Sequence, residues 1–318
     1  MAFQFARSES FIQGITRIVN EQIDLASEEL DRRPIDPITV PHQVRKQCEK
    51  IRALIRLAKA GMKNGKTYQQ ENTRLRDAAR MISDIRDAQV MINTYDHLMA
   101  LQSPEMDRRE FGPIRRRFSS RFESLLHERA SLEQSFQDIQ ASLLKSQQHI
   151  SDALLNNCRK SAMYEGLKTT YAKASRAKTE VFTQPTDEGF HDWRKHVKYH
   201  WYHCRLVRDV WDPVFSGRSS ELHRLEEYLG EDHDLSVFER WFTESREASR
   251  SSDWSYANLI GVIHQRKQML RTAVRPLGCR LFVESPKDFS KRICAYWKVW
   301  IQETPVNLGR PTCYLGRS

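Results

Sequence analysis

Apolar residues in this chain recur at the spacing of a helix face, and this periodicity constrains the fold more than any other feature. The first example lies between Ser8 and Leu30, where Phe11, Ile15, Ile18, Val19, Ile23 and Leu30 form one apolar stripe. No segment alternates apolar and polar residues as a half-buried strand does. Glycine and proline are scarce, at 12 and 11 of 318 residues, which suits long helices. The sequence therefore predicts an all-α protein.

Prolines, glycines and capping residues divide this pattern into segments. Pro34 and Pro37 end the first helix, and Thr67 with Gln70 has the spacing of a capping box that opens a later one. The predicted helices run to Leu30, from about Pro41 to Lys63, from Thr67 to Leu101, through a broken region from Ser103 to Ile150, from Asp253 to Leu277 and from Pro286 to Gln302. The tail, residues 305–318, has no helical period and is a candidate for disorder.

Three short motifs occur twice, in the same order and at similar spacing. FIQGI at Phe11–Ile15 is similar to MYEGL at Met163–Leu167, VPHQVRK at Val40–Lys46 to GFHDWRK at Gly189–Lys195, and RDAQV at Arg86–Val90 to HDLSV at His233–Val237. The offsets lie between about 147 and 152 residues, which indicates a duplicated helical unit. We predict a first repeat in residues 1–150 and a second in 151–304, packed together with a pseudo-two-fold relation.

The charge balance points to a polyanionic partner. The formal net charge is +10 and the pI is near 9.4, which fits nucleic acid, a polyphosphate or an anionic membrane surface. No stretch approaches the roughly 18 apolar residues of a membrane span, and the N-terminus MAFQFARSES lacks the apolar run of a signal peptide. The six cysteines are scattered without a C-x-x-C pair, as in a protein with reduced thiols. We expect a cytoplasmic protein without membrane contact.

Two helices at equivalent places in the repeat combine an apolar side with a face of cations. At 100° per residue, the first face contains His42, Arg45, Arg52, Arg56 and Lys59, with Glu49 among them. The second contains His191, Arg194, Lys195, Lys198, Arg205 and Arg208, with Trp201 among them. A basic stripe is usually only solvated surface. Two stripes with little acid favour an anion site, because guanidinium groups hold phosphate with two hydrogen bonds. For His42 and His191, packing at a helix start is the alternative.

Neighbouring acids and histidines have other expected roles. Asp87 and Asp234 repel phosphate, so we expect each to orient a nearby His or Arg, with an ordinary salt bridge as the alternative. His196, His200 and His203 follow one helix at i, i+4 and i+7, a spacing that permits a shared metal. No acidic ligand accompanies them, and aromatic neighbours favour packing. We therefore expect no metal site.

Longer motifs resemble one known family. HDWRKHVKYHWYHCRLV at His191–Val207, followed by LGEDHDLSVF at Leu229–Phe238, resembles the CHAD family, named for a histidine-marked α-helical domain. PHQVRKQCEKIRALIRLAK at Pro41–Lys59 is similar to its first-repeat motif, and LFVESPKDFSKRICAYWKVW at Leu281–Trp300 to its C-terminal segment. The likeness covers residues 8–302.

The resemblance implies two pseudo-symmetric four-helix bundles with a basic central surface that binds inorganic polyphosphate, in proteins that can associate with polyphosphate granules. The ligands it implies are His42, Arg45, Arg52 and Arg56 in the first copy and His191, Arg194, Lys198 and Arg205 in the second. This chain departs from the pattern twice. Glu49 stands where the second copy has Lys198, and Trp201 stands where the first has Arg52, so each half lacks one expected cation.

Two other classes of function fit less well. The charge also suits nucleic-acid binding, but no recognised DNA- or RNA-binding motif is present. Phosphoryl transfer needs carboxylates for magnesium and a phosphate loop, and there is no G-x-x-x-x-G-K-[ST] motif. Glu231, Asp232 and Asp234 are close in sequence, but adjacent acids on a helix point in different directions. We expect a non-catalytic polyphosphate-binding protein without a cofactor.

Overall fold

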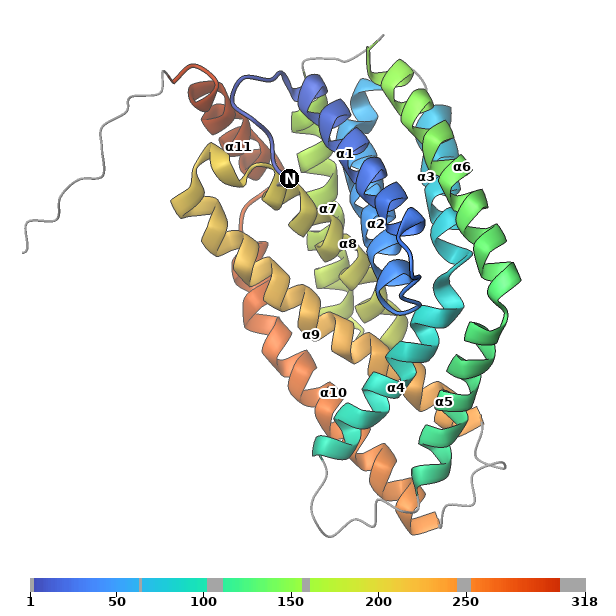
Figure 1. Cartoon of the computed structure of the whole chain (residues 1–318). Helices are drawn as coiled ribbons and strands as arrows, with labels where there is room; N and C mark the ends of the chain where they lie inside the picture. Colours follow the sequence, from blue (N-terminus) through green and yellow to red (C-terminus); the bar gives the residue numbers. More distant parts are fainter. Residues whose placement is uncertain (1–2, 63–64, 102–110, 156–160, 245–252, 304–318) are drawn as a thin grey trace, which may run out of the picture.

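All regular elements that the structure describes are helices. It is a computed structural model of the chain and describes residues 3–62, 65–101, 111–155, 161–244 and 253–303 (Figure 1). The helices are α1 (Phe11–Asp31), α2 (Thr39–Ala58), the 3-10 turn η1 (Lys59–Gly61), α3 (Gly65–Arg80), α4 (Ser83–Leu101), α5 (Gly112–His127), α6 (Arg129–Leu155), α7 (Ala162–Thr183), α8 (Asp187–Leu206), the 3-10 turn η3 (Arg208–Val210), α9 (Asp212–Glu244), α10 (Asp253–Leu281) and α11 (Pro286–Trp300). The predicted all-α class is confirmed.

Polar residues cap the helices where the chain changes direction. The Ser10 hydroxyl accepts a hydrogen bond from the Gln13 N–H at 3.3 Å, and the Gln13 side chain accepts one from the Ser10 N–H at 2.8 Å. This capping box opens α1. At the start of α8, the Thr186 hydroxyl accepts a hydrogen bond from the Gly189 N–H at 3.0 Å. The basic helix of the second half therefore begins at a fixed point.

The single helix predicted over Thr67–Leu101 is wrong, because two helices occupy this range. α3 ends at Arg80 and α4 begins at Ser83. The Ser83 hydroxyl donates a 2.9 Å hydrogen bond to the Arg80 carbonyl, which satisfies a backbone group that a continuous helix would have used. Neither glycine nor proline marks this break, so it has no strong signal in the sequence.

Other predicted boundaries shift by a few residues or cannot be placed. α2 ends at Ala58 rather than near Lys63, so Lys59 lies in η1. Pro276 is accommodated inside α10, which continues to Leu281. The helix start predicted at Ser103 and the tail at 305–318 lie outside the described residues.

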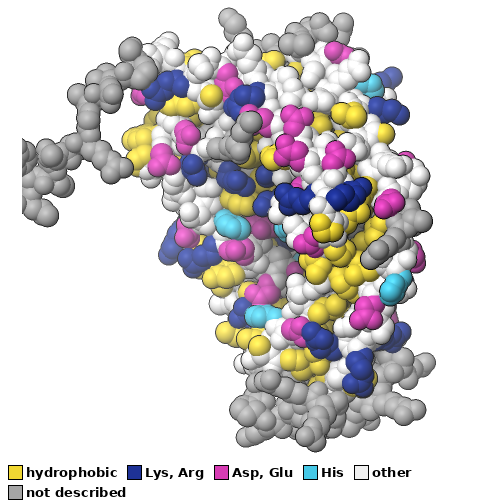
Figure 2. Space-filling model, in the orientation of Figure 1, with side chains coloured by type: hydrophobic (Ala, Val, Ile, Leu, Met, Phe, Trp, Pro, Cys, Tyr) yellow, Lys and Arg dark blue, Asp and Glu magenta, His cyan; other side chains and the backbone are white. Residues whose placement is uncertain are grey.

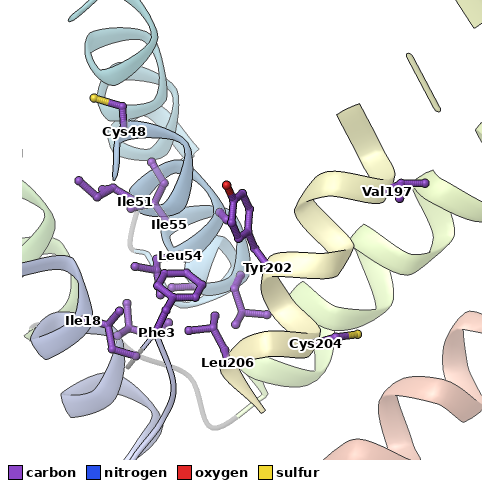
Figure 3. Close-up of a cluster of buried hydrophobic side chains, with 14 of the residues drawn as sticks. Phe3, Ile18, Cys48, Ile51, Leu54, Ile55, Val197, Tyr202, Cys204 and Leu206 are labelled. Atoms are coloured by element: carbon purple, nitrogen blue, oxygen red, sulfur yellow. The ribbon is translucent and has the colours of Figure 1, made fainter. Parts of the chain in front are cut away.

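The larger apolar core joins helices from both predicted halves. It includes side chains of α1, α2, α3 and α6 together with those of α7, α8 and α11. Figure 3 shows Ile55 of α2 close to Tyr202, which projects from α8 into this core. Nearby, a Cβ atom on Gly166 would lie 2.0 Å from the Leu57 carbonyl oxygen. Glycine is therefore required where α7 meets α2.

A second, smaller core also mixes the two halves. Its buried residues come from the α4–α5 region and from α9 and α10, which lie together in the lower part of Figure 1: Ile92, Tyr95, Leu98, Met99, Phe111, Ile114, Phe118, Leu235, Phe238, Phe242, Leu259, Ile263 and Leu270. α6 also runs through residues 150 and 151, where the predicted repeats meet. The division into residues 1–150 and 151–304 and the pseudo-two-fold relation stay predictions.

The described helices differ from membrane-spanning ones. None of them combines the length and the hydropathy needed to cross a membrane. The cysteines in the described ranges, Cys48, Cys204, Cys279 and Cys294, are free thiols.

Candidate functional site

α2 and α8, which carry the two predicted basic faces, pack against each other. At their contact, Oε2 of Glu49 lies 2.6 Å from Nζ of Lys198. The predicted repeat places these two residues at equivalent positions, so the residue that departs from the family pattern, Glu49, forms an ion pair with the residue predicted to be its counterpart. Burial alone would raise the pKa of Glu49, but Lys198, Arg194 and Arg45 hold it below its ordinary value. Glu49 is thus ionised at neutral pH and neutralises part of the charge between the stripes.

The cations of α2 and η1 are free of carboxylates. We call them the first stripe: His42, Arg45, Arg52, Arg56 and Lys59. Arg45 donates to the Ala79 carbonyl at 3.4 Å, and Arg52 donates to the Asn72 side chain at 3.1 Å. The Arg56 guanidinium lies 4.1 Å from the centre of the Tyr199 ring. Within the described ranges, none of the five forms an ion pair with an Asp or Glu side chain. The three arginines and Lys59 are therefore available to an anion, although the charges of Glu49 and Asp87 act on Arg45 from nearby and burial lowers the pKa of His42.

The cations of α8 and η3 are mostly paired. We call them the second stripe: His191, Arg194, Lys195, Lys198, Arg205 and Arg208. Besides the Lys198–Glu49 contact, Arg194 pairs with Glu226 at 3.1 Å and Lys195 with Asp192 at 2.6 Å. Arg208 lies 3.5 Å from Asp209 and 3.6 Å from Asp212. Two faces that look alike in sequence thus differ in the charge they offer.

The unpaired members of the second stripe contact aromatic rings. The Arg205 guanidinium lies 5.0 Å from the Trp201 ring centre, and the same indole stacks on His223 at 4.6 Å. The His191 ring stacks on His233 of α9 at 4.1 Å. Burial, with His191 and Arg194 nearby, lowers the pKa of His233 to about 3. Both rings are therefore mostly uncharged at neutral pH, since burial also lowers the pKa of His191.

The two aspartates expected to orient these groups behave differently. Asp87 lies 3.5 Å from its neighbour Arg86 and is exposed, which fits the alternative of an ordinary salt bridge. No hydrogen bond or ion pair of Asp234 is seen among the described residues; burial raises the pKa of its carboxyl group, and the nearby charges of Arg194 and Arg86 oppose that rise. An orienting role for Asp234 toward one of these arginines stays a prediction.

The spacing of three histidines would permit a shared metal, but in the structure each of them contacts a different group. His203 Nε2 lies 2.9 Å from the Ala53 carbonyl oxygen, and His200 Nε2 lies 3.2 Å from a guanidinium nitrogen of Arg218. Both rings are fully buried. His196 instead lines a cavity between α2 and α7. Over the described part of the chain, no group of three or more His, Cys, Asp or Glu side chains is placed to hold a metal ion.

Basic and acidic side chains are interleaved on the molecular surface. Figure 2 shows Lys and Arg side chains across the middle of one face, with Asp and Glu side chains close beside them. The net charge of +10 therefore does not describe the local field. What distinguishes a site here is a group of cations without nearby carboxylates.

Comparison with known families agrees with this architecture. The model of the CHAD domain matches residues 18–243. The chain belongs to the CHAD family. The matched range contains both stripes and ends within α9, so it is shorter than the likeness over residues 8–302 that the motifs indicated.

A solved CHAD structure has the same fold. The chain is similar to the crystal structure of the CHAD domain from the plant Ricinus communis, with a TM-score of 0.60 and 13% identity, over 87% of this chain and 94% of that one. At this identity the likeness is evidence for the fold alone. No curated protein matches the chain.

Sequence reasoning missed the residues that surround the end of the first stripe. Lys173 of α7 is close enough to Arg56 and Lys59 that these charges, after burial, lower its pKa. Neither the motifs nor the repeat indicated Lys173, because only the packing of α7 on α2 brings it near. A helix projection of α7 can place Lys173 on the polar side but cannot identify its neighbours.

Proposed function

We propose that this protein binds inorganic polyphosphate without turning it over, chiefly through the first stripe on α2 and η1. The observation that carries the proposal is that all five stripe residues lack carboxylate partners in the described ranges, while most of the second stripe is paired. Membership of the CHAD family supports the proposal, because the resemblance to this family implies polyphosphate binding. The non-catalytic part rests on the sequence, which has no phosphate loop.

The spacing of the first stripe suits a linear polyanion. Arg45 and Lys59 are fourteen positions apart, about 21 Å along a helix. Arg52 and Arg56 divide that length, so one extended chain can contact several guanidinium groups in succession. Each contact exchanges hydration for a charge-assisted hydrogen bond of about 1.5–3 kcal/mol.

Polyphosphate fits this surface better than nucleic acid. Proteins that bind single strands usually stack bases on several accessible aromatic rings. Trp201, the aromatic residue within the second stripe, already stacks on His223 and lies under Arg205. Tyr199, beside the first stripe, is covered by Arg56. Phosphate contacts remain available, while base-stacking surfaces are occupied.

The test is a reciprocal competition titration near physiological ionic strength. Long-chain polyphosphate should displace labelled RNA or DNA, and nucleic acid at equal phosphate concentration should not displace polyphosphate. The double variant Arg45→Ala/Arg52→Ala should weaken polyphosphate binding, with its helical circular dichroism unchanged. The matched control is Arg115→Ala/Arg224→Ala, which removes two arginines already paired with Asp96 and Glu221.

The outcomes separate the possibilities. A loss of affinity in the stripe variant but not in the control supports the proposal. Equal losses would mean that net charge alone drives binding. RNA or DNA that competes as well as polyphosphate would replace the proposal with nucleic-acid binding.

A further inference from the structure

A cavity of about 510 Å³ lies at the end of the first stripe, between the last turn of α2, η1, the start of α3, α7 and α8. Arg56, Lys59, Lys173 and His196 line it, with Tyr68 and Thr170 among the other walls. Gly166 also lines it, where α7 touches the Leu57 carbonyl. The cavity thus lies beside the place where α7 packs closely on the end of α2.

Its cations have no counter-ion among the described residues. Arg56, Lys59 and Lys173 make no ion pair there, and Glu165, the acidic residue of the lining, lies 3.6 Å from Lys168 outside the cavity. The Arg56 guanidinium is held over Tyr199 at 4.1 Å, and the Lys59 ammonium lies 4.8 Å from the centre of the Tyr68 ring. Three positively charged side chains therefore line the same cavity.

Two hydrogen-bonding groups in the lining are buried without a partner. They are Nε of Arg56 and Oγ1 of Thr170, and Thr170 is only 2% exposed. Buried polar atoms are nearly always satisfied, so these two atoms have an unused capacity for hydrogen bonding that a water or an anion can satisfy. Both atoms can donate a hydrogen bond, as can His196, which burial and the nearby Lys173 and Arg56 keep neutral, with a pKa of about 4. A phosphate oxygen is the acceptor that all three can use.

We propose that this cavity binds the terminal phosphate group of a polyphosphate chain whose following phosphates lie along the first stripe. The proposal rests on the proposed function and adds that the protein recognises the end of the chain. A terminal phosphate carries up to two negative charges, whereas each phosphate inside the chain carries one. The unpaired cations Arg56, Lys59 and Lys173 in one cavity match the more highly charged group, while Arg45 and Arg52, farther along the first stripe, match the inner ones.

The experiment compares tripolyphosphate with tripolyphosphate esterified at both ends, by calorimetry at fixed ionic strength. Esterification removes the second charge of each terminal phosphate and adds a neutral group that must enter the cavity. The test variant is Lys173→Ala, since this lysine lies outside the first stripe, is exposed, and its loss should not affect folding. Lys178→Ala is the matched control, because it removes a lysine from the same helix outside the cavity.

We expect free tripolyphosphate to bind the unaltered protein at least about tenfold more tightly than the esterified form, the value of one charged hydrogen bond. Lys173→Ala should remove most of that difference, and Lys178→Ala should preserve it. Long-chain polyphosphate should bind Lys173→Ala and Lys178→Ala nearly equally, because its inner phosphates use the first stripe, which both variants keep intact. Equal binding of the two short chains, or equal loss in Lys173→Ala and Lys178→Ala, would overturn end recognition.

The same titrations distinguish a failure of end recognition from a failure of the proposed polyphosphate binding. If long-chain polyphosphate binds but the ends make no difference, only end recognition is wrong. If the long chain does not bind the unaltered protein, polyphosphate binding itself is wrong, whatever the short chains do.

Discussion

Replacing Glu49 by glutamine should raise the affinity of the protein for polyphosphate. The substitution keeps the size of the side chain but removes the carboxylate that lies 2.6 Å from Lys198. Lys198 then loses its partner, and Arg45 and Arg194 lose a nearby negative charge. The net charge rises by one from +10, at the contact between the two stripes.

Removing this ion pair should have two opposing effects, a gain in affinity for polyphosphate and a loss of folding stability. One freed lysine can make one further charge-assisted contact of about 1.5–3 kcal/mol, or roughly 10- to 150-fold in affinity. The slope of log affinity against log salt should steepen by about 0.7 for that extra phosphate, as for a single-stranded polyanion. The fold should lose about 1–3 kcal/mol, between the values of an exposed and a buried pair, because the Lys198 and Glu49 side chains are 23% and 30% exposed.

Calorimetric titrations with long-chain polyphosphate at several salt concentrations, with thermal melts, measure both effects. The matched control is Glu231→Gln. The Glu231 carboxylate lies 2.6 Å from Arg266 of α10, and the Glu231 and Arg266 side chains are 25% and 26% exposed. This variant makes the same change of charge and should cost stability without a gain in affinity. Unchanged affinity and salt slope in folded Glu49→Gln would refute the reasoning, and an equal gain in both variants would reduce it to net charge.

Three further predictions concern the fold. Burial lowers the pKa of fully buried His203 from its ordinary 6.5 to about 4. Between these two pH values the unfolded chain binds a proton at His203 and the folded protein does not. Stability should therefore fall as the pH drops from 6.5 toward 4. At pH 5 His203 alone should account for about 2 kcal/mol of the loss measured by urea denaturation, and His203→Gln should remove that share of the pH dependence. Gly166→Ala should cost about 1–3 kcal/mol in a thermal melt, because its Cβ would lie 2.0 Å from the Leu57 carbonyl oxygen; an unchanged melting temperature would mean that α7 can move away freely. Residues 1–155 alone should not melt cooperatively, because the larger core includes side chains of α7 to α11 and the smaller core those of α9 and α10; a stable fragment would contradict this.

Local signals in the sequence were enough for the fold class and most helix positions. The stripe from Phe11 to Leu30 lies in α1, and the predicted start at Pro286 is the first residue of α11. The break between α3 and α4 could not be predicted, because a single hydroxyl on Ser83 closes the end of α3. Serine is common in helices and loops alike, so only the observed hydrogen bond reveals its role.

At the candidate site, too, the sequence could not predict which side chains contact one another. A helix projection places Arg194 and Arg52 on equivalent basic faces, and both lie on α2 or α8 as predicted. It cannot show that Glu226, on the next helix, reaches Arg194 while no carboxylate in the described ranges reaches Arg52. Pairing depends on how the helices pack, so the sequence indicates where cations lie but not which ones remain free.

The position of Glu49 explains why two similar stripes can differ in charge. If position 49 carried a lysine, as the equivalent position 198 does, two ammonium groups would meet where α2 and α8 pack. Their repulsion would oppose the packing that holds the halves together. A glutamate on one side turns that repulsion into an attraction, at the cost of one cation for the ligand. The second stripe then contributes to packing through Glu49 and Glu226, and the first remains available. On this argument the two stripes have different roles, and variants of the first stripe should impair binding more than variants of the second.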